Sequence, residues 1–196
     1  MGSIFGIDPN QMNFTQLSNL FNTVRADKYL GRRFPGNFSE DDYTNMEHLY
    51  NWFNHFTRTY DLGKAYNTFK FNQILAWFDG KVKSPSSQLK WVTISVNEID
   101  LVTAHNGLGI ASAFCIEELY RKGRTTNLNC EGGTPFASSI LLELHSDDGT
   151  SFYVKVRHNG KYMNLCGARQ ITCPYSQWKS EIQKEVIPDP TSVCGK

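Results

Sequence analysis

The stretch Trp91-Val-Thr-Ile-Ser-Val96, followed by Asn97-Glu-Ile-Asp100, decides how this sequence is interpreted. Its apolar, β-branched run predicts a strand, and we expect a helix to begin after it, over Leu101 to Leu108. In open α/β sheets, ligands bind in the crevice outside the carboxyl ends of the strands. The sequence puts an amide and a carboxylate, Asn97 and Glu98, at that position, with no nucleophile and no histidine.

Two interpretations of Asn97 and Glu98 are open. In the first, they are polar residues at a strand-to-helix turn, and Asp100 is the N-cap of the helix. In the second, they are a working or altered site, because the N-terminus of a helix can hold an anion. The carboxylates of Glu98 and Asp100 would repel an anion unless they were protonated. We favour the first interpretation.

Composition excludes several classes of protein. The 196 residues are 40% hydrophobic, which suits one globular domain, or one and a half, with its own core. The net charge is +1 and the basic residues are scattered, so no nucleic-acid partner is expected. Apolar runs such as Ser138 to Leu144 fall far short of the roughly 20 residues that span a bilayer, so no transmembrane segment is predicted. Either the chain never enters a secretory route, or its signal has been removed.

The cysteines favour an oxidising compartment. No two form a Cys-x-x-Cys pair and no histidines have ligand spacing, so neither a metal site nor a cofactor is expected. Two short separations enclose loops rich in Gly, Asn, Thr and Pro, typical of small disulfide loops in secreted proteins. The alternative is five reduced thiols in a cytosolic protein. All five lie in the second half: Cys115, Cys130, Cys166, Cys173 and Cys194.

If Cys115 pairs with Cys130 and Cys166 with Cys173, Cys194 is left over. An odd cysteine in an exported chain indicates a disulfide to another chain. Two triplets, beginning at Asn13 and Asn37, match the N-glycosylation acceptor pattern and agree weakly with export. We therefore expect a location in the secretory pathway, lysosomal or extracellular, with a component of an organellar assembly as the alternative.

Composition divides the chain into a helical segment (1–83), a linker (84–90) and a mixed α/β segment (91–196). Apolar residues recur at helical spacing three times in the first segment, over Phe14 to Val24, Met46 to Phe53 and Phe71 to Phe78. Ser39 followed by Asp42 resembles a capping box, which predicts that the second helix starts there.

The mixed segment changes to a period of two at Ile140 to Leu144. Asp148-Gly149 predicts a hairpin turn into a second strand, and Asn159-Gly160 predicts a further turn into Tyr162 to Leu165. This pattern indicates an antiparallel meander. A last helix begins near Pro174, with Tyr175, Trp178, Ile182 and Val186 on its apolar face.

This order of elements, with its residues, resembles the C-terminal half of the histidine acid phosphatase family, in the branch of lysosomal, prostatic-type and protist enzymes. The resemblance implies an α/β fold: a helical cap segment (1–83), then strand and helix, an antiparallel meander and a terminal helix. The resemblance rests on four local matches. The segments Tyr29-Leu-Gly-Arg-Arg33 and Phe38 to Tyr43 are similar to the family's helical cap, and Thr134 to Leu144 is similar to one of its strands. Asn164 to Tyr175 is similar to its short disulfide loop, and Ile187 to Cys194 is similar to its tail.

The chain departs from this family in two places. It lacks the Arg-His-Gly-x-Arg-x-Pro motif, whose histidine attacks phosphorus; Arg157-His158-Asn159-Gly160 echoes it only superficially, because it occupies a predicted strand and turn. The family's His-Asp pair falls on Asn97-Glu98. Phosphoryl transfer through a phosphohistidine needs an imidazole, cationic donors and a general acid. Only the acid has a candidate here, Glu98.

The departures predict a non-catalytic, phosphatase-derived structural or interaction subunit, a pseudoenzyme. The first alternative is one piece of a split or proteolysed acid phosphatase with Glu98 as substitute general acid. The second is a module that binds phosphate esters without turning them over. In the family, the missing half supplies much of the sheet, so the expected strand Trp91–Val96 would keep open edges. We therefore expect another polypeptide to complete the sheet.

Overall fold

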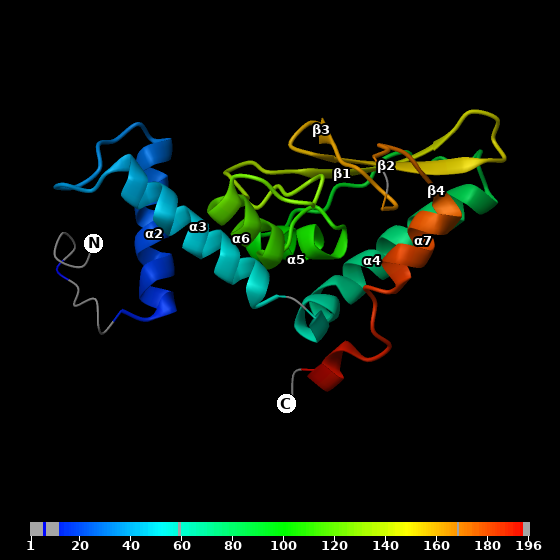
Figure 1. The fold of residues 1–196 in the computed structure, drawn as a ribbon. Coiled ribbons are helices and arrows are strands. Elements are labelled where there is room, and N and C mark those ends of the chain that lie inside the picture. Colours follow the sequence, from blue (N-terminus) through cyan, green and yellow to red (C-terminus); the bar gives the residue numbers. More distant parts are fainter. Residues whose placement is uncertain (1–5, 7–11, 59, 168, 194–196) are drawn as a thin grey trace. The chain divides into compact units, whose positions relative to one another are not determined.

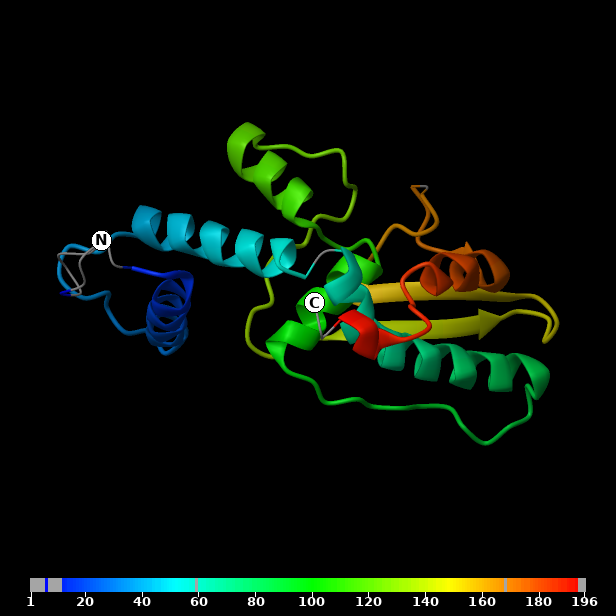
Figure 2. The same ribbon diagram turned by 90° about the horizontal axis from the view of Figure 1, so that it is seen from below.

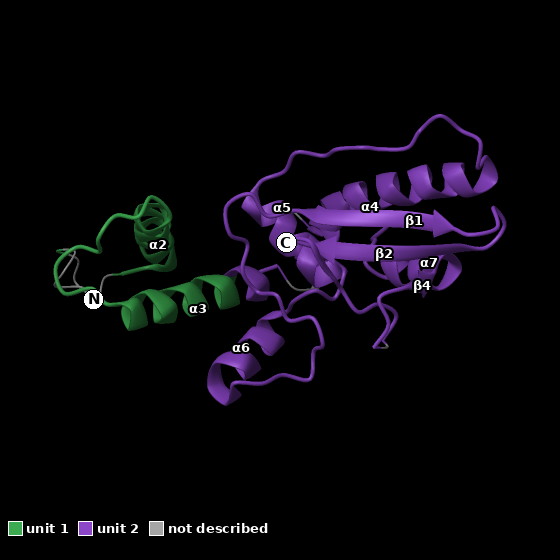
Figure 3. Ribbon diagram, turned by 90° about the horizontal axis from the view of Figure 1, so that it is seen from above, with its two compact units in different colours: residues 1–53 green, residues 54–196 purple. Residues whose placement is uncertain are grey.

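A computed structural model describes residues 6, 12–58, 60–167 and 169–193. The chain divides into two compact units, residues 1–53 and residues 54–196, coloured separately in Figure 3. This division does not coincide with the change of composition at 84–90. The long helix before that linker therefore belongs to the same unit as the sheet.

Unit 1 contains the helix α2 (Phe14–Tyr29) and most of α3 (Glu40–Phe56). The oxygen of the Asn13 side chain accepts from the backbone N–H of Gln16 at 3.0 Å and caps α2. At the start of α3, the Ser39 hydroxyl accepts from the backbone N–H of Asp42 at 3.1 Å, so the predicted helix start is confirmed. Buried residues from both helices and the loop between them form the core of this unit: Phe21, Val24, Phe38, Tyr43, Met46 and Tyr50.

Unit 2 combines helices with a small antiparallel sheet, so the fold is mixed α and β as expected. Figure 1 shows its elements. Its helices are α4 (Tyr60–Lys83), α5 (Glu98–Gly107), α6 (Ala113–Lys122), α7 (Tyr175–Gln183) and the short 3-10 helix η1 (Pro190–Val193). Its strands are β1 (Ile140–Ser146), β2 (Phe152–His158), β3 (Lys161–Tyr162) and β4 (Cys173–Pro174). No helix in the described part of the chain is both long and apolar enough to cross a bilayer.

The sheet is built on the β1–β2 hairpin. Its register places Leu142 opposite Val156 and Leu144 opposite Val154. The turn contains Gly149 at φ 75°, a left-handed conformation that favours glycine. β3 and β4 each pair with β2, also antiparallel. The predicted meander is thus confirmed around both turns, although its third strand is only two residues long.

One face of the sheet is packed and the other is polar. Figures 1 and 2 show α4 and α7 on the same side of the hairpin. Val154 and Val156 are fully buried on that side, in one core cluster with Phe71 of α4 and Trp178 of α7. The opposite face carries the ion pair between Arg157 and Glu143. Such asymmetry is typical of antiparallel sheets.

The predicted strand Trp91–Val96 is wrong for this chain. The segment has no helix or strand structure and, within the described residues, its backbone pairs with no strand. Figure 2 shows it as a stretched connection from the end of α4 to the start of α5. An alternating apolar pattern specifies side chains that suit a strand, but a strand also needs a neighbour for its backbone groups. No parallel pair of strands occurs in the described sheet.

Candidate functional site

The candidate site is the junction of the Trp91–Val96 segment with α5. Asn97 is extended, with φ −89° and ψ 176°, and its side-chain oxygen accepts from the backbone N–H of Asp100 at 3.1 Å. Asn97 is therefore the N-cap, and α5 begins at Glu98. The prediction of Asp100 as N-cap, with the helix starting at Leu101, is wrong by three residues, because the amide of Asn97 is an equally good cap.

Glu98 is directed at a loop that lies far along the chain. The Thr134 hydroxyl donates to Glu98 Oε1 at 2.7 Å, and Thr134 is 5% exposed. A carboxylate that accepts a bond from a buried hydroxyl satisfies a group that would otherwise be costly to bury. The contact ties the first turn of α5 to the loop before β1. Glu98 therefore has a structural partner in this arrangement.

Asp100 forms an ion pair with a residue of α4. The Lys70 ammonium donates to Asp100 Oδ1 at 2.7 Å and to the Thr103 hydroxyl at 3.3 Å. The two charged side chains are 16% and 29% exposed, so water screens this pair less than a surface pair. The Asn67 amide adds a bond to the Thr103 carbonyl at 2.8 Å. These contacts fix α5 against α4.

The junction has the polar atoms of a helix start rather than those of a phosphate site. The amide of Asn97 caps the helix, and the ammonium of Lys70 is paired with Asp100. Arg157 lies on the polar face of the sheet, where its Nε donates to Glu143 at 2.7 Å. His158 is buried at the end of β2, and Asn159 occupies a turn with φ 48°. The Arg157–Gly160 echo of the phosphatase motif thus lies in a strand and turn, as its sequence context predicts.

The segment before the junction carries exposed apolar side chains. Exposed fractions are 68% for Trp91, 41% for Val92, 45% for Ile94 and 39% for Val96. Strand β1 lies at the edge of the sheet, and within the described residues only β2 pairs with it. Figures 2 and 3 both show the segment on the β1 side of the sheet rather than on the β2 side. Apolar side chains and unpaired backbone groups on one side of a unit are typical of an interaction surface.

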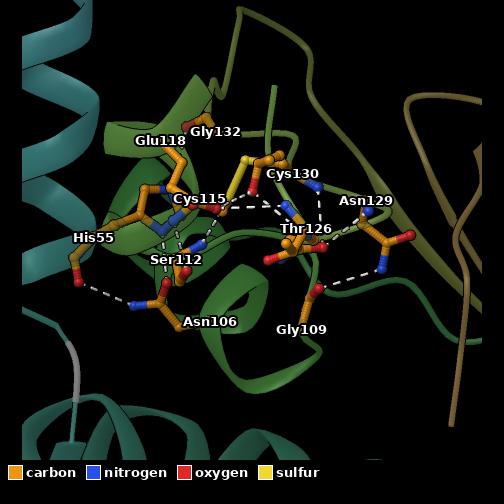
Figure 4. The surroundings of a disulfide bond; sticks show 12 residues. His55, Asn106, Gly109, Ser112, Cys115, Glu118, Thr126, Asn129, Cys130 and Gly132 are labelled. Carbon is orange, nitrogen blue, oxygen red and sulfur yellow. Dashed lines mark hydrogen bonds between the residues drawn. A yellow bond between two sulfur atoms is a disulfide. The ribbon is translucent and has the colours of Figure 1, made fainter. Parts of the chain in front are cut away.

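Both short cysteine pairs are disulfides. Cys115 is joined to Cys130 and Cys166 to Cys173, with a Cα–Cα distance of 5.9 Å in each pair. Figure 4 shows the first bond linking α6 to the loop that contains Asn129. These bonds are compatible with an oxidising compartment. Cys194, the predicted intermolecular cysteine, lies outside the described residues.

The two predicted glycosylation positions are at the surface of unit 1. Asn13 and Asn37 are both exposed. Asn13 also has a structural role, because its side-chain oxygen caps α2. A glycan on the Asn13 nitrogen leaves that oxygen in place, so the two roles are chemically compatible.

A surface cavity of about 390 Å³ lies between the end of α5, two loops and α7. Its amide side chains are used within the protein. The Asn129 amide donates to the carbonyls of Gly109 and Asn164 at 3.2 and 3.0 Å, and Asn127 accepts from the backbone N–H of Asn129 at 2.9 Å. These amides therefore hold the loops together.

Sequence reasoning missed the partners of the site and a group of buried histidines. Thr134 and Lys70 lie 36 and 30 residues from the carboxylates they contact, and no local pattern indicates such pairs. His55, His105 and His158 come from three elements of unit 2 and lie close together. In the described part of the chain, no three His, Cys, Asp or Glu side chains are placed to hold a metal ion.

No protein-family model matches the sequence, and no curated protein matches it.

Proposed function

We propose that this chain is a non-catalytic interaction subunit, derived from the histidine acid phosphatase family, that binds an extended segment of another polypeptide. The observation that carries the proposal is the Trp91–Val96 segment. Its apolar side chains are exposed, and its backbone pairs with no strand in the described residues. An added strand supplies backbone hydrogen bonds, and alternate side chains supply specificity.

The alternation of the segment defines the contact face. In an extended chain, Val92, Ile94 and Val96 project to one side, and Thr93 and Ser95 project to the other. The first set is 39 to 45% exposed. A partner strand that covers this face removes three β-branched side chains from water, which stabilises the complex.

Helix α4 adds apolar surface in the same unit. Leu62, Tyr66 and Phe69 follow the spacing of one helix face and are 41%, 48% and 69% exposed. Exposed rings and aliphatic chains in a row are unusual on a surface that stays in water. This row supports a partner that covers more than the Trp91–Val96 segment.

The absence of the Arg-His-Gly motif from the sequence supports a non-catalytic role. The contacts of Asn97 with the helix backbone and of Glu98 with Thr134 add to it, because both side chains have structural partners. The two disulfides favour an oxidising location, lysosomal or extracellular. Cys194 is the proposed site of a covalent link to the partner.

The interaction is tested on the chain in its native assembly by sizing under native conditions in a Cys194→Ser background, in which no disulfide at Cys194 can retain a released partner. We expect the wild-type chain to migrate with a partner and Ile94→Asp to release it, because a carboxylate cannot be buried in an apolar contact without cost. Ser95→Asp carries the same charge on the opposite side and serves as the matched control. Migration of the wild-type chain without any partner, taken from its native assembly, contradicts the proposal.

A phosphomonoester assay at acid pH on the same assembly tests the non-catalytic role. We expect Glu98→Gln to leave any background hydrolysis unchanged. Activity that is abolished by Glu98→Gln overturns the proposal and favours the split acid phosphatase. Binding of inorganic phosphate without hydrolysis favours the phosphate-binding module instead.

A further inference from the structure

Three buried histidines lie next to one another in unit 2. His105 of α5 has its ring centroid 4.4 Å from that of His158 at the end of β2 and 6.0 Å from that of His55 near the end of α3. His55 and His105 are fully buried and His158 is 3% exposed. The three rings thus join three elements in a place that water does not reach.

His105 has no means of stabilising a positive charge. Neither of its ring nitrogens has a hydrogen-bond partner among the described residues. Its titratable neighbours are His158 and His55, and burial, followed by the proximity of these two rings, lowers the pKa of His105 to about 3. A proton on His105 would therefore be a buried, unpaired charge.

His55 differs from His105 in having acceptors at both ring nitrogens. Its Nδ1 lies 2.6 Å from Asn106 Oδ1, and its Nε2 lies 3.2 Å from the Gly132 carbonyl. The Asn106 amide nitrogen donates to the His55 and Arg58 carbonyls, which fixes the orientation of that amide. Burial lowers the pKa of His55, the nearby Arg58 adds to this, and the two acceptors oppose it. The cation of His55 can keep both contacts.

His158 faces one charge of each sign. Burial lowers its pKa, the Glu131 carboxylate opposes the shift, and the Lys161 ammonium adds to it. Glu131 and Lys161 are themselves paired, with Nζ and Oε1 2.5 Å apart. The Nε2 atom of His158 is buried and, within the described residues, has no hydrogen-bond partner. The ring of His158, like that of His105, is therefore most stable when it is neutral.

We propose that His55, His105 and His158 form an acid-sensitive latch, which holds α5 against β2 and the end of α3 at neutral pH and releases α5 as the pH falls. His55 is protonated first, because hydrogen-bond acceptors at both of its ring nitrogens stabilise the cation. The resulting charge lies beside His105, which takes up a proton only when α5 moves away from the sheet.

The sign of the effect follows from proton linkage. Well above pH 6.5, the usual pKa of histidine, the rings are neutral in both the closed and the open state, and the latch is fully stable. Below it, the open state binds protons that the closed state excludes, so stability falls. Each ring that stays neutral in the closed state lowers the closing equilibrium constant by up to tenfold per pH unit below pH 6.5, or about 30-fold in total between pH 7.5 and 5.0.

The test uses the full chain with hydrogen exchange followed from pH 7.5 to 5.0, corrected for the intrinsic exchange rate. We expect the opening equilibrium of α5 to rise about 30-fold or more in the wild type. In His105→Gln, which keeps a polar side chain that cannot titrate, the rise should be smaller by about 30-fold. His145→Gln, on the polar face of the sheet, is the matched control and should behave as the wild type does.

Histidine ring NMR of the folded wild-type chain keeps the test decisive if the variant does not fold. We expect the His105 ring to remain neutral down to pH 5. Titration of His105 near pH 6.5 without opening of α5 overturns the proposal. An equal rise of α5 exchange in wild type and His105→Gln also overturns it.

Discussion

The β1–β2 hairpin and the Trp91–Val96 segment have similar residue patterns but different structures. Both alternate apolar and polar residues and both are rich in residues that favour strands. In the hairpin, Asp148-Gly149 brings a second strand back along the first, and Val154 and Val156 become fully buried. The segment has no such turn beside it, and its side chains stay exposed. Local pattern predicts the tendency to form a strand, while pairing depends on a neighbour.

The largest expected effect is in the hairpin. Val156→Asp places an unpaired carboxylate in the core beside Phe71 and Trp178, which are also buried. We expect a loss of more than about 3 kcal/mol in the free energy of unfolding, enough to prevent folding of a marginal unit. Urea denaturation followed by circular dichroism measures it. A loss below about 1 kcal/mol would show that β2 is not a core strand.

The next largest loss in the free energy of unfolding is expected when a disulfide is removed. Replacing Cys115 and Cys130 by serine opens a loop with a sequence separation of 15, for which chain entropy gives a loss of about 3 kcal/mol. The separation of 7 between Cys166 and Cys173 gives about 2.4 kcal/mol. Denaturation of the two double variants measures the order. The second bond leads into β4, a neighbour of β2, and a larger loss there would show that strand pairing outweighs loop entropy.

A smaller effect is expected where the Trp91–Val96 segment meets α5. Lys70→Met removes the partner of Asp100 and should cost about 1 kcal/mol, since this pair is mostly shielded from water. Lys122→Met removes a pair on α6 in which the lysine is 60% exposed, and should cost under about 0.5 kcal/mol. Equal losses in the two variants would show that the contact between α4 and α5 contributes little.

The smallest effect on stability is expected in the segment itself. Ile94→Asp, the same kind of change as Val156→Asp, should alter the free energy of unfolding of the isolated chain by under about 0.5 kcal/mol, because Ile94 is 45% exposed. The same urea experiment measures it. A loss comparable with that of Val156→Asp would mean that the segment is packed in the isolated chain.

Much of the fold could be predicted from the sequence, because these parts of the structure depend on residues that are close together in the chain. The helical period of α2, the Ser39–Asp42 start of α3 and the Asp148-Gly149 turn each depend on residues a few positions apart. The same holds for the two short disulfide loops. Local signals of this kind need no knowledge of the rest of the chain.

The remainder depends on contacts between distant residues. Asn97 and Asp100 are both suitable N-caps, and the position at which the chain turns into α5 makes Asn97 the cap. At that turn, Lys70 contacts the carboxylate of Asp100 and Thr134 contacts that of Glu98. The proximity of His55, His105 and His158 likewise requires the folded arrangement of α5 and β2. For Trp91–Val96, the sequence indicates a strand and the structure of this chain contains no described partner for it.

Hydrogen exchange of the isolated chain at neutral pH tests the central claim most directly, because it compares the backbone amides of the two regions in one experiment. Paired amides of β1 and β2 should be strongly protected, and the amides of Trp91–Val96 should exchange close to the rate of an unstructured peptide. Binding of the partner polypeptide should then slow exchange in the segment. Strong protection of Trp91–Val96 in the isolated chain would contradict the account, because it would mean that the segment already has a strand partner.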